Sequence, residues 1–189
     1  MVSRDGRATV SRIKSKLPLN ISDFLGNKLL SATINKFTLL LLYMSYKGIY
    51  RPSNPKKYKG DHRNIIYRSL WERKFMNYCD LNENILEWAS EEFWVPYKDP
   101  TTNRVRRYFP DFFIKYKDKD GNIKRSVIEV KPLRETLEPK ITKGKSRKTL
   151  INESMTYVKN QAKWKAAKEF CDDRKLEFKI MTEKELGIR

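Results

Sequence analysis

Apolar residues recur at helical spacing in two parts of the chain. Leu70, Phe75 and Tyr78 would lie on one face of a helix, which the pattern predicts over about 69–81. A longer helix is predicted over 151–171, where apolar residues stand three or four positions apart. We expect these two helices to cover a core.

Strand-like patterns fill most of the sequence between and after the helices. The segments that alternate or form short apolar runs are 91–97, 105–116, 126–130 and 176–181. Turn residues at 99–103 and a hairpin signal at Asp120-Gly121 separate the first three. A helical turn is expected at 182–186. The order helix, three strands, helix, strand predicts an α/β fold with a mixed sheet flanked by helices.

Three regions lack these patterns. Residues 1–43 begin polar and basic, and Met44 opens a run that looks like the start of a compact protein, so we interpret 1–43 as a poorly ordered or dispensable extension. Residues 44–66 are rich in Tyr, Pro, Lys and Asn and predict an irregular basic arm. This division leaves 67–189 as the folded domain. Within it, 133–150 is predicted to be a flexible basic loop.

The charge of the chain predicts a polyanionic partner. The 189 residues carry 41 Lys and Arg against 23 Asp and Glu, a formal net charge of +18. Such an excess favours salt-sensitive binding to nucleic acid, although a ribosome- or membrane-associated basic protein would share it. The apolar run at 37–44 is too short to span a bilayer, so we expect no membrane partner. With His62 as the only histidine and no metal-ligand spacing at Cys79 or Cys171, zinc sites and histidine-based triads are excluded.

Charged residues interrupt two strand patterns that should otherwise be buried. Asp111 follows a proline at the start of an apolar run, and Glu129 and Lys131 share one face of the next strand because side chains repeat every two residues. Carboxylates are the hard ligands that Mg²⁺ or Mn²⁺ prefers, so Asp111 and Glu129 are candidate metal ligands, with the carbonyl of Val130 as a third. Lys131 could orient or deprotonate an attacking water. This pattern predicts phosphodiester hydrolysis, and a loop aspartate beside a solvated Glu–Lys pair is the alternative.

Glu72 has two competing interpretations. It stands three residues after Ser69, so it fits a capping box in which its carboxylate returns to the start of the helix. It could instead complete the acidic cluster as a further metal ligand. The spacing by itself favours the cap.

Several basic and polar residues are candidate DNA contacts. Arg104, Arg106 and Arg107 precede Asp111 and would hold a substrate beside the metal ligands. The other candidates are Lys143, Lys145, Arg147 and Gln161. A solvated loop would carry the same lysines, and Gln161 could equally be a residue at the edge of an apolar helix face.

The tyrosines of the basic arm also leave two possibilities open. Tyr46, Tyr50 and Tyr58 alternate with lysines and arginines, a mixture that can stack on bases and contact phosphates. The same segment could instead pack on the surface of the domain.

In combination, these motifs resemble a known nuclease superfamily. "PD" at 110–111 with "EVK" at 129–131 is similar to the core of the PD-(D/E)xK nucleases, and "YRSLWERKF" at 67–75 is similar to the helix that precedes this core in the TnsA-like branch. The runs "RYFPDFFIK", "IEVKP" and "NQAKWKAAKEFC" resemble the head completion nucleases of contractile-tailed phages, over about 44–189. The resemblance implies a restriction-endonuclease-like fold.

The resemblance also implies residue roles. It identifies as site residues Glu72, Asp111, Glu129 and Lys131. This raises Glu72 above a simple helix cap. TnsA-like enzymes often carry glutamine where Glu129 stands here, which leaves the number of metal ions open.

The biological role that the resemblance implies is the completion of DNA-filled phage heads. We expect a Mg²⁺- or Mn²⁺-dependent endonuclease, with exonuclease activity as a further expectation, that cuts or trims packaged double-stranded DNA so that the tail can join. The expected partners are head, portal or neck proteins, and the expected location is the host cytoplasm during assembly or the virion. Two other hypotheses stay open: a structural or DNA-clamping head protein with a vestigial site, and a transposon-end nuclease that depends on a transposase.

Overall fold

The computed structural model describes residues 47–187, so the predicted extension at 1–43 and Tyr46 lie outside the described residues. The elements in chain order are β1 (Gly48–Tyr50), the 3-10 helix η2 (Pro55–Lys57), β2 (Ile65–Tyr67), α2 (Leu70–Leu81), β3 (Ile85–Ser90), β4 (Val95–Asp99), β5 (Arg104–Tyr108), β6 (Phe112–Lys117), β7 (Ile123–Val130), α3 (Leu133–Thr136), α4 (Arg147–Asp173) and β8 (Glu177–Met181). No helix among these is long and apolar enough to cross a membrane.

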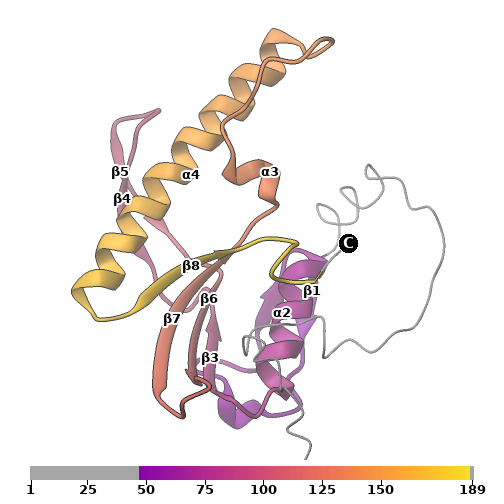
Figure 1. Ribbon diagram of the computed structural model, residues 1–189, viewed down its shortest axis with the longest axis vertical. Helices are drawn as coiled ribbons and strands as arrows, with labels where there is room; N and C mark the ends of the chain where they lie inside the picture. The colour runs from indigo at the N-terminus through magenta and orange to yellow at the C-terminus, as the bar shows by residue number, and fades with distance from the viewer. Residues whose placement is uncertain (1–46, 188–189) are drawn as a thin grey trace, which may run out of the picture.

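A mixed four-stranded sheet forms the centre of the fold, in the order β3-β6-β7-β8. β6 is antiparallel to both β3 and β7, and β8 is parallel to β7. A parallel pair needs a long crossover, and α3 and α4 supply it between β7 and β8 (Figure 1). The predicted mixed α/β sheet with flanking helices is therefore confirmed.

The two faces of the sheet pack against different helices. On one face, Phe75 of α2 lies in a large buried cluster with Ile128 of β7. On the other face, Trp164 and Ala167 of α4 form a second cluster, against which Ile180 of β8 packs. Since neighbouring side chains of a strand point to opposite faces, Glu129 points to the α4 side while Ile128 points to α2.

β4 and β5 form a two-stranded antiparallel ribbon outside the main sheet. Val95 and Tyr108 are buried in the cluster with α4, so one face of the ribbon is covered by that helix. The single strand predicted over 105–116 is wrong, because Pro110 separates β5 from β6. Proline cannot donate to a strand ladder, and here the chain leaves the ribbon and enters the main sheet. The turn at 99–103 is confirmed between β4 and β5.

Two other parts of the chain differ from the sequence-based expectations, and a third agrees with them. β3 was not predicted, because a register irregularity between Ile85 and Glu87 breaks its alternation. The loop expected over 133–150 contains α3, and α4 begins at Arg147 rather than at 151. The helical turn expected at 182–186 is confirmed, because the N–H of Leu186 donates to Thr182 O at 3.0 Å.

The basic arm is a packed part of the domain. β1 and β2 pair within it, so the prediction that the arm is irregular is wrong. Tyr50 and Tyr58 are buried in the core cluster, which supports the packing interpretation for these two tyrosines. Asp80, at the end of α2, accepts hydrogen bonds from the Tyr50 hydroxyl and from the backbone N–H of Asn54, and so ties the arm to the helix.

Candidate active site

Two carboxylates stand opposite each other at one end of the sheet. β6 and β7 pair Phe112 with Ile128, so the next pair in the same register is Asp111 with Glu129. Lys131 lies two residues beyond Glu129 and therefore on the same α4-facing side. The three side chains line one pocket of about 470 Å³. The structure thus brings together residues that the sequence placed on different strands.

Glu129 is held on both of its oxygens. It is only 3% exposed. The Tyr108 hydroxyl donates to its Oε2 at 2.5 Å, and Lys131 Nζ lies 3.1 Å from its Oε1. A buried carboxylate needs such hydrogen-bonded and charged partners, so the pair fixes the orientation of Glu129. Tyr108 was not predicted as a site residue, although it stands in the same short motif as Asp111.

Asp111 receives a backbone hydrogen bond from the facing strand. The N–H of Val130 donates to its Oδ2 at 2.7 Å, while the N–H of Lys131 points the other way, to Met181 O of β8. Within a strand, the N–H and C=O of one residue point to the same side, so the Val130 carbonyl also faces Asp111. Burial, together with the neighbouring charge of Glu129, holds the pKa of Asp111 well above its usual value, and the charge of Lys131 opposes this rise.

Glu72 enters the same pocket from the first turn of α2. In this structure its Oε1 accepts from the Ser69 hydroxyl at 2.9 Å, and its Oε2 accepts from the backbone N–H of Arg68 at 2.8 Å. Ser69 Oγ in turn accepts from the N–H of Glu72. Both expected features of Glu72 are therefore present, a cap and a position at the pocket, while its role as a metal ligand stays a prediction.

Lysine and arginine side chains balance the acids of the pocket. Lys163 of α4 lines it, and its Nζ lies 5.6 Å from the centroid of the Tyr108 ring. Burial lowers the pKa of Lys163, and the charge of Glu129 opposes that change. Gln161 is exposed and is not among the described residues that line the pocket, so α4 contributes Lys163 where Gln161 was predicted. Local sequence offers no signal for Lys163, because it reaches the pocket only through the packing of α4 on the sheet.

An ion pair lies at another part of the pocket lining. Arg68 bonds Glu91, and neither residue was predicted at the site. Glu91 follows β3, its N–H donates to Asp111 O at 3.3 Å, and its backbone has a φ of 54°. This left-handed conformation turns the chain away from the sheet at the row of the two acids.

The donor set of the pocket suits a hard divalent cation that keeps several waters. Within residues 47–187, no three His, Cys, Asp or Glu side chains converge so that they could hold a metal by themselves. What the site offers is the carboxylates of Asp111 and Glu129 with the nearby Val130 carbonyl. Mg²⁺ is commonly bound by only one or two carboxylates, and a cation there would offset the repulsion that raises the pKa of Asp111.

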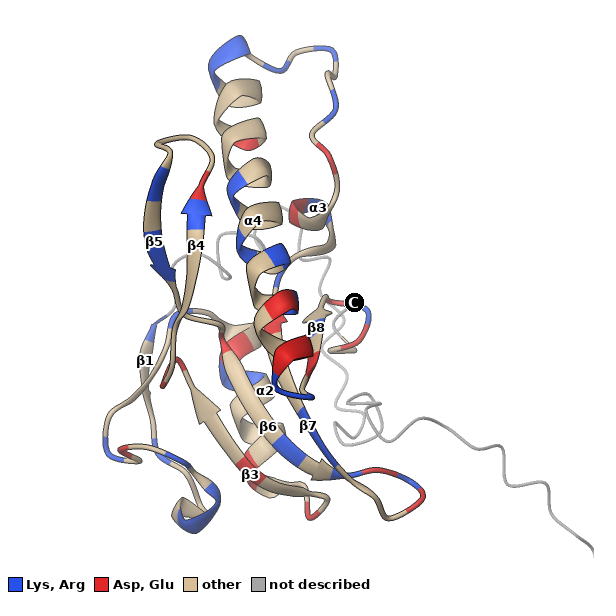
Figure 2. Ribbon diagram, turned by 90° about the vertical axis from the view of Figure 1, so that its left-hand side faces the viewer, with Lys and Arg blue, Asp and Glu red and all other residues tan. Residues whose placement is uncertain are grey.

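The predicted DNA contacts divide into near and distant groups. Arg107 lines the pocket. Arg104 and Arg106 lie on exposed parts of β5, and Arg106 Nε is 3.1 Å from Asp99. Figure 2 shows Lys and Arg residues along β5 and along α4.

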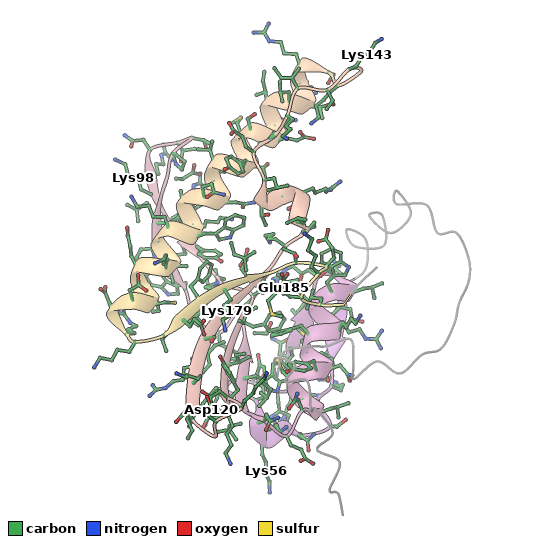
Figure 3. The ribbon with its side chains drawn as sticks, in the orientation of Figure 1. Lys56, Lys98, Asp120, Lys143, Lys179 and Glu185 are labelled. Carbon is green, nitrogen blue, oxygen red and sulfur yellow. The ribbon has the colours of Figure 1, made fainter. Side chains whose placement is uncertain are left out.

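The remaining predicted contacts lie at the far end of α4. Figure 3 shows Lys143 at the tip of the turn before this helix, away from the sheet. Lys145 bonds Glu153 at 2.5 Å, and Arg147 begins α4. None of these three is among the described residues that line the pocket, so they stay predictions for contacts made at a distance from it.

Comparisons with known proteins agree with this geometry. Residues 82–183 match the family described as TnsA-like endonuclease N terminal. The head completion nuclease of Enterobacteria phage T4 is 37% identical over 143 residues, which cover 74% of this chain and 93% of that protein. The matched family range contains Asp111, Glu129 and Lys131 and begins after Glu72.

Proposed function

Because the chain belongs to the TnsA-like endonuclease family, we propose that this pocket hydrolyses phosphodiester bonds of double-stranded DNA with the help of Mg²⁺ or Mn²⁺. The observation that carries the proposal is the facing pair Asp111 and Glu129, with Lys131 at 3.1 Å from Glu129. Buried like charges of this kind are unfavourable unless a cation or a proton joins them. A nuclease site provides the reason to keep them.

The carboxylates of Asp111 and Glu129, with the Val130 carbonyl, would hold the cation. When bound, it would neutralise phosphate charge and lower the pKa of a water at the site. Tyr108 keeps Glu129 in place through its hydroxyl, and the Val130 N–H keeps Asp111 in place.

Lys131 and Lys163 supply positive charge on the α4 side of the pocket. Lys131 Nζ would orient the attacking water and stabilise the negative charge that develops on the phosphate. Lys163 also lines the pocket and would face the phosphate from α4. Glu72 would join the metal ligands only after its cap bonds to Ser69 and Arg68 are released.

DNA would approach along the ribbon. Arg107 would contact the phosphates next to the cleaved bond from the pocket. Arg104 and Arg106, which share the other face of β5 with Tyr108, would contact the DNA backbone beside it. The cations at the start of α4 would contact the backbone further away. The net charge of +18 supports binding that weakens steeply with salt, because each phosphate contact releases counterions.

The biological role that we propose follows the T4 relative. The similarity covers 93% of that head completion nuclease, which supports a role in finishing DNA-filled heads. The protein would cut or trim packaged DNA near the head opening, by endonuclease action and, at free ends, exonuclease action. Its partners would be head, portal or neck proteins, in the host cytoplasm during assembly or in the virion. The test is whether filled heads made without the protein join tails after addition of the wild type but not of Lys131→Ala.

The catalytic proposal is tested with matched lysine variants. Lys115 Nζ lies 3.3 Å from Glu87 on the same face of the sheet, so Lys115→Ala removes a similar pair outside the pocket. On duplex DNA with Mg²⁺, Lys131→Ala and Asp111→Asn should lose at least about 100-fold in rate. Lys115→Ala should cleave like the wild type, and EDTA should stop cleavage.

Two substrates and one binding assay complete this test. Closed circular DNA reports endonuclease action, and end-labelled linear DNA reports exonuclease action. Retained DNA binding by Lys131→Ala would show that its fold is intact. Equal cleavage rates for Lys131→Ala and Lys115→Ala, or cleavage unaffected by EDTA, would refute the proposal.

A further inference from the structure

Two exposed aromatic residues flank the ends of β4 and β5 that lie near the pocket. Trp94 is 46% exposed and Phe109 is 44% exposed. Val95 and Tyr108 are the last pair of the β4–β5 ladder, and Trp94 directly precedes this pair while Phe109 directly follows it. Phe109 also lines the pocket that holds the acids.

The same ribbon adds a guanidinium to the aromatic pair. The Arg107 guanidinium lies 4.9 Å from the centroid of the Trp94 ring, a cation–π distance. Arg107 lines the pocket as well. Trp94, Arg107 and Phe109, which we call the ribbon platform, therefore combine two aromatic rings and one planar cation on one surface.

Packing among residues 47–187, the part that the structure describes, does not account for this surface. Val95 and Tyr108 point toward α4 and are buried. Since side chains alternate along a strand, their neighbours Trp94, Arg107 and Phe109 point to the opposite face, where α4 cannot cover them. Single exposed apolar residues are ordinary, but a cluster of aromatic rings beside a reactive pocket indicates a ligand.

We propose that the ribbon platform stacks against an unpaired nucleobase next to the phosphate that is cleaved. Aromatic rings and arginine planes are the groups on which proteins stack the bases of single strands. Bases inside a duplex are already stacked on their neighbours and cannot reach such a surface. The platform therefore selects DNA with an overhang, a frayed end or a single-stranded junction beside the cut.

The position of the platform fits this substrate. Phe109 precedes Asp111 by two residues, so their Cα atoms are at most about 7 Å apart. A phosphate held near Asp111 and Glu129 thus has the platform within reach of a neighbouring base. This inference rests on the proposed function, because it assumes a nucleic-acid substrate.

Tryptophan fluorescence of Asp111→Asn tests binding without cleavage. The chain has four tryptophans, of which Trp88 and Trp164 are buried and Trp71 is partly buried, so Trp94 is the one most open to a ligand. A duplex with a single-stranded overhang should quench this fluorescence more than a blunt duplex with the same paired length. In the same background, Trp94→Leu should remove the difference.

Affinity and cleavage measurements provide the second readout, with a control on the same ribbon. Phe109→Leu and Trp94→Leu are each measured for DNA affinity in the Asp111→Asn background and for cleavage rate in the otherwise wild-type enzyme. For the overhang substrate, both quantities should fall by about tenfold or more, which is the effect of losing one base stack. The blunt duplex should change little. Val105 is 74% exposed on the same face of β5, farther from the pocket, so Val105→Ala should change neither substrate.

Any other outcome would refute the proposed role of the ribbon platform. Equal losses on blunt and overhang DNA would make these residues general DNA contacts. Unchanged DNA preference, with loss of head–tail joining by the two leucine variants, would assign the surface to a protein partner. If the wild type cleaves DNA but does not distinguish the two substrates, the proposed base stacking is refuted while the proposed nuclease function stands. If no form of the protein binds or cleaves DNA, the proposed function fails together with it.

Discussion

The Tyr108–Glu129 hydrogen bond should control how well the pocket binds its cation. Tyr108→Phe removes one hydroxyl and keeps the ring that packs with Tyr97 and α4. Burial and the charge of Glu129 raise the pKa of Tyr108, so in the wild type its hydroxyl remains a proton donor at neutral pH. After the substitution, Glu129 retains only the interaction with Lys131 and can rotate away from Asp111.

The expected magnitude follows from the kind of bond that is lost. A hydrogen bond to a charged group contributes about 1.5–3 kcal/mol. Loss of an outer-sphere partner of a metal ligand typically costs about 10- to 100-fold in metal affinity or activity, which corresponds to a similar free energy. We therefore expect the Mg²⁺ concentration for half-maximal cleavage to rise by about tenfold or more, with a smaller loss at saturating Mg²⁺.

Cleavage rates measured across a Mg²⁺ titration check this expectation. Tyr97→Phe is the control, because Tyr97 packs edge-on against Tyr108 but is not among the described residues that line the pocket. Its Mg²⁺ dependence should match the wild type. If Tyr108→Phe and the wild type respond to Mg²⁺ in the same way, Tyr108 does not position Glu129, and the reasoning from the hydrogen bond fails.

Three further predictions concern stability. Ser69→Ala should lower the free energy of unfolding by about 1 kcal/mol in urea titrations, because it removes the cap of α2, and an unchanged value would show that Glu72 caps the helix alone. Asp80→Ala should lower it by at least about 2 kcal/mol and increase hydrogen exchange in the arm, since Asp80 is fully buried and accepts from Tyr50 and the backbone of the arm. Folding raises the pKa of Asp111, so the protonated carboxyl is the form that the fold tolerates. The contribution of Asp111 to folding stability is therefore complete below its unfolded pKa of about 4 and is lost as pH rises through its folded pKa. In EDTA, Asp111→Asn should therefore be more stable than the wild type at neutral pH and lose this advantage near pH 4, and equal stability at both pH values would contradict the buried repulsion.

The predictable part of the fold came from regular patterns. The stripe at 69–81 and the Ser69 cap predicted α2 almost to its ends, because local spacing and capping determine a helix start. β3 was missed because its irregular register hides the alternation. The strands of the arm were missed, and sequence left the place of its tyrosines open, because Tyr50 is fixed by Asp80, which is distant in sequence.

The same distinction applies to the site. Asp111, Glu129 and Lys131 were predictable, because a charged residue in a buried strand conflicts with its pattern. Tyr108 and Lys163 were not, since each reaches the pocket only through the packing of the ribbon and α4 on the sheet. Local sequence carries no signal for such contacts between elements that are far apart in the chain.

The two cores explain how the fold tolerates two facing acids. Asp111 and Glu129 stand in one row of the sheet, with the α2 cluster on one side and the α4 cluster on the other. Their repulsion destabilises the fold, but neither acid can move away, because the Val130 N–H fixes one and Tyr108 fixes the other. Apolar burial on both faces of the sheet thus offsets the destabilisation of the fold, and the hydrogen bonds orient the two carboxylates. Because both carboxylates are already held in place, a bound divalent cation would spend little of its binding energy on ordering them.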